Sequence, residues 1–248
     1  MGTRGWISPF DTAMFYRNEH ILGNALNKTD ITREELFITT KLWNSDHGYD
    51  QTKKAFEKSL KKLQLDYVDC YLIHWPSKKY MESWKAMEEI YAAGKAKSIG
   101  VSNFTLEHLE DILAHGSVVP AVNQIEIHPY FQQNEMIDFL TKHNIAHEAW
   151  SPLGAGNKGL FEEPTLKALA EKYHKNIGQI ILRWHLQRNT IVIPKSSNQK
   201  RLESNIDLWD FALEQTDMEA IAKLDKDKRT GPNPHNKFFL WFTTFLKG

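Results

Sequence analysis

Short apolar runs that end on polar residues recur along the chain. The first run covers residues 37–42 (FITTKL), where apolar and β-branched side chains lead to Lys41. Runs of this length and composition are typical of buried strands. Five later runs repeat the pattern, at residues 68–74, 97–103, 121–127, 146–151 and 190–196. The polar tips of the six runs are Lys41, His74, Asn103, Gln124, Ser151 and Lys195.

Amphipathic segments separate these runs. Residues 52–63 place Phe56, Leu60 and Leu63 at helical spacing. Residues 82–95 do the same with Trp84, Met87, Ile90 and Tyr91, and further helical segments cover residues 106–116, 134–144 and 164–176. Several of these segments end on Gly or Asn after Lys or His, which is a signal for the end of a helix.

The alternation of strands and helices predicts an α/β fold with a parallel sheet and helices outside it. The polar tips recur about every 30 residues, the length of one βαβ unit. At the carboxyl ends of parallel strands such tips meet at one pocket, so Lys41 need not be buried in the core. No GxGxxG follows an early strand. We therefore expect a (β/α)8 TIM barrel and not a Rossmann sheet.

The composition narrows the classes of partner. The chain has 248 residues, and its 31 Lys and Arg balance its 31 Asp and Glu, so no net charge attracts nucleic acid or an anionic membrane. Cys70 is a single cysteine and cannot form an internal disulfide. No apolar run approaches the roughly 18 residues that span a bilayer. We expect a cytoplasmic protein without nucleic-acid or membrane partners.

Four titratable side chains of different kinds lie at or near the strand ends: Asp11, Tyr16, Lys41 and His74. Each has an ordinary structural explanation, as a helix cap, a packed ring, a solvated edge residue or a structural histidine. Together they suit proton chemistry on a carbonyl, because an ammonium lowers the pKa of a phenol and a carboxylate holds the ammonium in place. Such a site stabilises a developing alkoxide, and a nicotinamide must supply the hydride.

A basic segment near the C-terminal end of the last run offers an anion site. In IPKSSNQKRLESN (193–205), Lys195 and Arg201 bracket a Ser-Ser-Asn run that leads into a predicted helix. Backbone N–H groups at a helix start, hydroxyls and two cations bind phosphate well. A solvated basic turn is the alternative.

Seven blocks of the chain, in order, resemble those of the aldo-keto reductases, and the prostaglandin F synthase and 2,5-diketo-gluconate reductase branch is the most similar. RTGPNP (229–234) near the C-terminus also fits this family. The blocks are FDTAMFYRNE, LFITTKLWN, YVDCYLIHWP, IGVSNF, VNQIEIHPY, AWSPLG and IPKSSNQKRLESN, from Phe10 to Asn205.

This resemblance implies an NADPH-dependent reductase of small aldehydes and ketones that binds no metal. Asp11, Tyr16, Lys41 and His74 would form the catalytic tetrad, with Tyr16 as general acid, Lys41 lowering its pKa, Asp11 paired with Lys41, and His74 orienting the substrate. Among the cofactor residues, Ser102, Asn103 and Gln124 would hold the carboxamide and Trp150 would stack on the nicotinamide. Lys195, Ser196 and Arg201 would bind the 2′-phosphate, Asn205 would contact the adenine, and Ser151 and Leu153 would also bind the cofactor. Trp43 and Trp75 would line the substrate site, or simply pack at the barrel mouth. Ser204 departs from the pattern, because relatives commonly carry Glu there.

The N-terminus departs from the family pattern. Only MGTRGWISPF precedes Asp11, where family members have a first strand, a first helix and usually a hairpin. We therefore expect a single barrel domain over residues 1–248 that lacks its first strand and helix, with six clear strands and a remnant around Phe10. Unpaired strand edges would then be a liability.

The tail FFLWFTTFLKG (238–248) is unusually aromatic. It packs over the barrel, covers the hole left by a missing strand, or drives self-association of an otherwise monomeric protein. Two alternatives to a working reductase stay open: a non-catalytic NADPH-binding protein, and an inactive truncated barrel.

Overall fold

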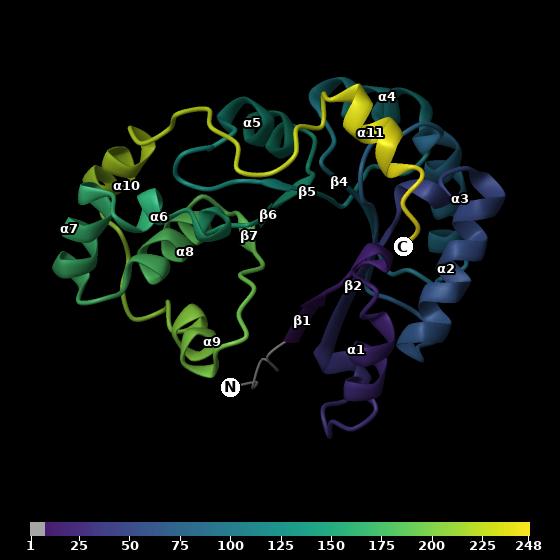
Figure 1. Cartoon of the computed structure of the whole chain (residues 1–248), viewed down its shortest axis with the longest axis horizontal. Helices are drawn as coiled ribbons and strands as arrows, with labels where there is room; N and C mark the ends of the chain where they lie inside the picture. The colour runs from purple at the N-terminus through teal and green to yellow at the C-terminus, as the bar shows by residue number, and fades with distance from the viewer. Residues whose placement is uncertain (1–7) are drawn as a thin grey trace. The chain divides into compact units, whose positions relative to one another are not determined.

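The computed structural model describes residues 8–248, and Figure 1 shows the course of the chain. In these residues seven strands alternate with helices, and the strand order from β1 to β7 follows the sequence. The predicted α/β class is confirmed. Residues 1–7, part of the short lead on which the expectation of a missing strand and helix depends, lie outside the described residues.

The chain divides into two compact units. The first unit holds the described residues up to Asn123 together with Pro234–Gly248, and the second holds Gln124–Asn233. The predicted catalytic residues all belong to the first unit. Most of the predicted cofactor residues belong to the second.

The strands pair in parallel within each unit. In the first unit the registers include Asp11↔Thr39, Thr39↔Cys70 and Leu72↔Gly100, and in the second unit Glu148 pairs with Ile191. Each of the six predicted runs contains one strand. The strands are β1 (Ser8–Asp11), β2 (Leu36–Leu42), β3 (Cys70–Ile73), β4 (Ile99–Ser102), β5 (Val122–Glu126), β6 (Ala146–Trp150) and β7 (Ile191–Val192).

The observed strands differ in detail from the predicted runs. Gln124 is not a tip, because it lies buried in the middle of β5, where Ile125 and Glu126 continue the strand. β7 has only two residues and ends well before Lys195, and Pro194 between them cannot donate a ladder hydrogen bond. The remnant predicted around Phe10 is a four-residue strand, β1, paired with β2.

Helices α1, α2 and α3 are neighbours in the first unit (Figure 1). The predicted apolar face of α2, with Phe56 and Leu63, is fully buried, and so is Trp84 of α3. Tyr91, which the spacing groups with Trp84, is instead 42% exposed. The α-helices of this unit are α1 (Glu19–Leu26), α2 (Tyr49–Leu63), α3 (Tyr80–Ala92), α4 (Leu106–His115) and α11 (Lys237–Thr243). Its short 3-10 helices are η1 (Met14–Tyr16), η2 (Arg33–Glu35) and η3 (Asn44–Asp46).

The second unit packs α7 against α8 and α10. Asn176 and Gln179 form a reciprocal capping box at the start of α8. The helices of this unit are α5 (Asn134–Lys142), η4 (Gly154–Gly156), α6 (Lys158–Phe161), α7 (Pro164–Tyr173), α8 (Ile177–Gln187), α9 (Gln199–Ile206) and α10 (Gln215–Ala222). Among residues 8–248, no helix has both the length and the apolar character needed to cross a membrane.

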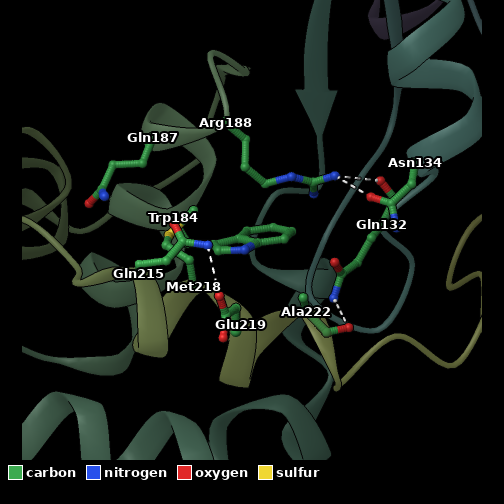
Figure 2. A pocket seen from close by; sticks show the side chains of 9 residues that line it. All are labelled: Gln132, Asn134, Trp184, Gln187, Arg188, Gln215, Met218, Glu219 and Ala222. Carbon is green, nitrogen blue, oxygen red and sulfur yellow. Dashed lines mark hydrogen bonds between the residues drawn. The ribbon is translucent and has the colours of Figure 1, made fainter.

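An open hollow of about 330 Å³ lies between the start of α5, the end of α8 and α10 (Figure 2). Arg188 donates from Nη2 to Asn134 Oδ1 at 2.6 Å, and its guanidinium lies 4.5 Å from the ring centroid of Trp184. The amide of Gln132 donates to the carbonyl of Ile221 at 2.9 Å. These side chains tie the three elements together, so the hollow is a structural junction.

The aromatic tail contacts loops of the first unit. Asn44 Nδ2 donates to Thr243 Oγ1 at 2.7 Å, and the ring of Phe239 meets the edge of Trp75 with centroids 5.0 Å apart. The tail therefore packs on the segments that follow β2 and β3. Coverage of a hole and self-association stay predictions.

Candidate active site

Lys41 is fully buried near the end of β2, and its charge is compensated. Its ammonium donates to Asp11 Oδ1, at the end of the neighbouring strand β1, and to the carbonyl of Thr12 at 3.1 Å. We expected that Lys41 need not be buried in the core, but its side chain is 0% exposed. A buried ammonium is costly without a partner, and the carboxylate supplies one.

Tyr16 is the last residue of η1, in the loop that follows Asp11. Lys41 Nζ lies 5.3 Å from the centroid of its ring. Burial raises the pKa of the Tyr16 phenol, Lys41 lowers it through its charge and as a hydrogen-bond partner, and Asp11 raises it again. The net shift is upward. Lys41 thus lowers the pKa of Tyr16, as predicted, but the loss of solvation on burial raises that pKa by more.

His74 follows β3 and is buried beside these groups. Its ring centroid lies 5.7 Å from that of Tyr16, and the two rings are perpendicular. Burial, the charge of Lys41 and the nearby His47 together hold the pKa of His74 well below its ordinary value. The imidazole is therefore neutral at neutral pH and keeps one N–H to donate.

Three aromatic side chains line the same region. Trp43 lies with its ring centroid 5.1 Å from that of His74, and Trp75 lies 6.4 Å from it. Phe15 stacks on Trp43 at 3.9 Å with an interplanar angle of 20°. The indole N–H of Trp43 donates to the carbonyl of Leu246 at 2.7 Å, so the C-terminal tail fixes this ring.

Asn103 joins the ends of β3 and β4. Its Nδ2 donates to the carbonyl of His74 and to Ser102 Oγ, each at 3.0 Å. The backbone of Asn103 has φ 62°, a left-handed conformation in which Asn is more common than most residues. The structure thus brings Ser102 and Asn103 next to the backbone of His74.

The other predicted cofactor residues lie in the second unit. Gln124 is buried in β5, Trp150 ends β6, and Ser151 follows it with φ 49°. A Cβ on Gly231 would lie 2.3 Å from the ring of Trp150, so only glycine fits beside that indole. Leu153 precedes η4 and is partly exposed.

The basic segment, residues 193–205, includes the start of α9. Asn198 caps this helix by accepting from the N–H of Arg201 at 3.1 Å, and the N–H of Asn198 donates to Ser196 Oγ at 3.1 Å. Lys195 and Arg201 are exposed. Asn205 lies in α9, next to Ser204, which accepts from Asn176 Nδ2 at 2.6 Å.

Several groups that contribute to the candidate site were not predicted from the sequence. Phe15 could have been found, because it precedes Tyr16 in the same block. The carbonyl of Thr12 and that of Leu246 give no signal in the sequence, because every residue carries a carbonyl. His47 is buried against Ser77, with Nδ1 3.0 Å from Ser77 Oγ, and burial lowers its pKa to about 4.

Comparison with known proteins agrees with this arrangement. The chain belongs to the aldo/keto reductase family, whose model matches residues 6–226. The chain is 49% identical to the glyoxal reductase of Bacillus subtilis (strain 168) over 230 residues, which cover 92% of this chain and 83% of the relative. It is 48% identical to the methylglyoxal reductase DkgA of Escherichia coli (strain K12), over 90% of this chain and 82% of that protein.

Solved structures lead to the same family. A crystal structure of a Gox0644 mutant in complex with NADPH has a TM-score of 0.87 and 46% identity to this chain. The similarity covers 92% of this chain and 83% of that one. The predicted family is therefore confirmed, while the roles of the individual residues stay predictions.

Proposed function

We propose that this protein reduces small aldehydes and ketones to alcohols with NADPH, and that Tyr16 donates the proton. The observation that carries the proposal is the buried ammonium of Lys41, held by Asp11 and lying beside the ring of Tyr16. Membership of the aldo/keto reductase family supports carbonyl reduction as the reaction class.

The four side chains have separate tasks in this proposal. Tyr16 gives its proton to the carbonyl oxygen as negative charge develops there, and Lys41 stabilises the phenolate that is left. Asp11 holds Lys41 in place. His74, kept neutral by burial and by Lys41, donates a hydrogen bond that orients the substrate oxygen. NADPH, when bound, would supply the hydride for the carbonyl carbon.

The residues present fit NADPH. Lys195 and Arg201 are exposed and form no ion pair with any described residue, and the capped start of α9 lies between them in sequence. Two unpaired cations beside a helix start suit a phosphate. In this proposal Lys195, Ser196 and Arg201 would hold the 2′-phosphate, and Asn205 would contact the adenine. Ser102, Asn103 and Gln124 would bind the carboxamide, Trp150 would stack on the nicotinamide, and Ser151 and Leu153 would also bind the cofactor.

We further propose that the strands form one barrel domain of the (β/α)8 type. The solved relatives with high TM-scores support this architecture. The names of the relatives make glyoxal and methylglyoxal the first substrates to try. The aromatic wall of Phe15, Trp43 and Trp75 suits small carbonyl compounds with an apolar face.

The test is the consumption of NADPH by the purified chain when methylglyoxal is added. We expect oxidation that depends on the aldehyde and that is much slower with NADH. NADPH binding, seen as fluorescence quenching, without any turnover across a panel of aldehydes would contradict the proposal and favour the non-catalytic alternative.

A further inference from the structure

The loop that carries Tyr16 is closed by one side-chain hydrogen bond. The hydroxyl of Thr12 donates to Asn18 Oδ1 at 2.7 Å, and the two residues flank the loop with Tyr16 between them. Asn18 is the N-cap residue of α1, yet its side chain caps no backbone N–H of that helix. The amide oxygen of Asn18 accepts the Thr12 hydroxyl in place of the backbone N–H that an N-cap side chain usually accepts.

Thr12 is fixed on three sides. Its N–H donates to the carbonyl of Thr39 in β2 at 2.9 Å, and its own carbonyl accepts from Lys41 at 3.1 Å. Its hydroxyl holds Asn18, whose carbonyl in turn accepts from the N–H groups of Ile21 and Leu22 at 3.0 Å. The Thr12–Asn18 bond therefore joins the residue that meets Lys41 to the start of α1.

The backbone between Thr12 and Asn18 forms a tight turn that other contacts must hold in place. The N–H of Tyr16 donates to Ala13 at 3.0 Å and that of Arg17 to Met14 at 3.2 Å, which makes a tight 3-10 turn. Arg17 then has φ 55°, a left-handed conformation that is uncommon for a residue other than glycine. Such conformations persist only when the surroundings determine them. Arg17 also donates to the carbonyl of Lys247 at 2.7 Å.

We propose that Asn18, acting through the hydroxyl of Thr12, is a positioning residue that sets the distance between the Tyr16 phenol and the Lys41 ammonium. Loss of the bond lets the turn relax, and the phenol moves away from Lys41. This inference depends on the proposed role of Tyr16 as the acid.

The test compares paired variants. Thr12→Val keeps the shape and removes the donor, and Thr12→Ser keeps the hydroxyl. Asn18→Ala removes the acceptor. Thermal melting of each variant checks that it is folded. The two readouts are kcat and KM for methylglyoxal, and the phenol pKa of Tyr16 from its absorbance in alkali, isolated by subtracting the titration of Tyr16→Phe.

We expect Thr12→Val and Asn18→Ala to lower kcat on the order of tenfold or more, because small misplacements of a catalytic group are costly. The pKa of Tyr16 should shift in both, because the burial that raises it and the charge of Lys41 that lowers it both depend on the position of the phenol. Thr12→Ser should behave as the wild type, and the double variant Thr12→Val with Asn18→Ala should be no worse than the more impaired single variant.

An unchanged phenol pKa in Thr12→Val, with kcat within about twofold of the wild type, would overturn the proposal. The phenol titration needs no turnover. A protein without reductase activity whose Tyr16 pKa still responds to Thr12→Val would therefore contradict the proposed function and leave the positioning role supported.

Discussion

Asp11→Asn tests the buried ion pair that organises the candidate site. The variant keeps the shape of the side chain and removes the charge that compensates Lys41. Loss of one partner from a buried pair costs about 3–5 kcal/mol of unfolding free energy, because the other charge stays buried. The Asp11 side chain is 14% exposed, and Lys41 keeps the Thr12 carbonyl as an acceptor. We therefore expect the lower end of this range, about 3 kcal/mol.

Urea denaturation with both variant and wild type gives this difference directly. For a chain of this size, about 3 kcal/mol corresponds to a melting temperature lower by about 6–12 °C. The double variant Asp11→Asn with Lys41→Met should recover much of the loss, because no unpaired ammonium is left in the interior. A single variant within about 0.5 kcal/mol of the wild type would refute the reasoning, because surface substitutions already span that range.

Three further predictions address acid stability, the cofactor and the tail. Because the pKa of His47 is lowered to about 4 in the folded protein, the unfolded chain binds more protons than the folded one as the pH falls from about 6.5. The unfolding free energy should therefore fall between neutral pH and pH 4. In His47→Gln this fall should be smaller than in the wild type, by up to about 3 kcal/mol at pH 4. Arg201→Ala should raise the Kd for NADPH about tenfold, because one charge-assisted hydrogen bond to the phosphate is lost, and should change the Kd for NADH little. Lys200→Ala is the matched control. Equal effects of Arg201→Ala on both cofactors would argue against a 2′-phosphate site. Deletion of residues 238–248 should lower the melting temperature, because it removes the partners of Trp43, Asn44 and Trp75. Phe245→Ser, which changes an exposed ring, should leave the melting temperature unchanged. An unchanged melting temperature in the deletion variant would show that the tail contributes no stability.

The fold was largely predictable because buried strands and amphipathic helices have different periodicities. β2, with its apolar and β-branched residues, is a clear case. No helix was predicted over α8, and the reason is physical: Ile180, Ile181 and Leu182 are all buried, so the helix shows no polar face at this point. A short apolar run of this kind does not distinguish a helix from a strand. Gln124 was misplaced because a strand buried on both faces can carry an amide in its interior.

The residues of the candidate site were predictable from the sequence, but their burial and their pKa shifts were not. The strand ends and their chemistry singled out Asp11, Tyr16, Lys41 and His74, and the resemblance to a family supplied their roles as a tetrad. The complete burial of Lys41 and the net upward pKa shift of Tyr16 depend on packing, which local sequence does not encode. The contact of Trp43 with Leu246 joins residues about 200 positions apart, so no local pattern could have predicted it.

The most direct test of the proposed reductase is the turnover number of Tyr16→Phe at saturating NADPH and methylglyoxal, with NADPH affinity measured on the same sample. We predict that the turnover is lost while the affinity is kept, because phenylalanine keeps the ring and removes only the acidic hydroxyl. Turnover equal to that of the wild type would contradict the assignment of Tyr16 as the proton donor.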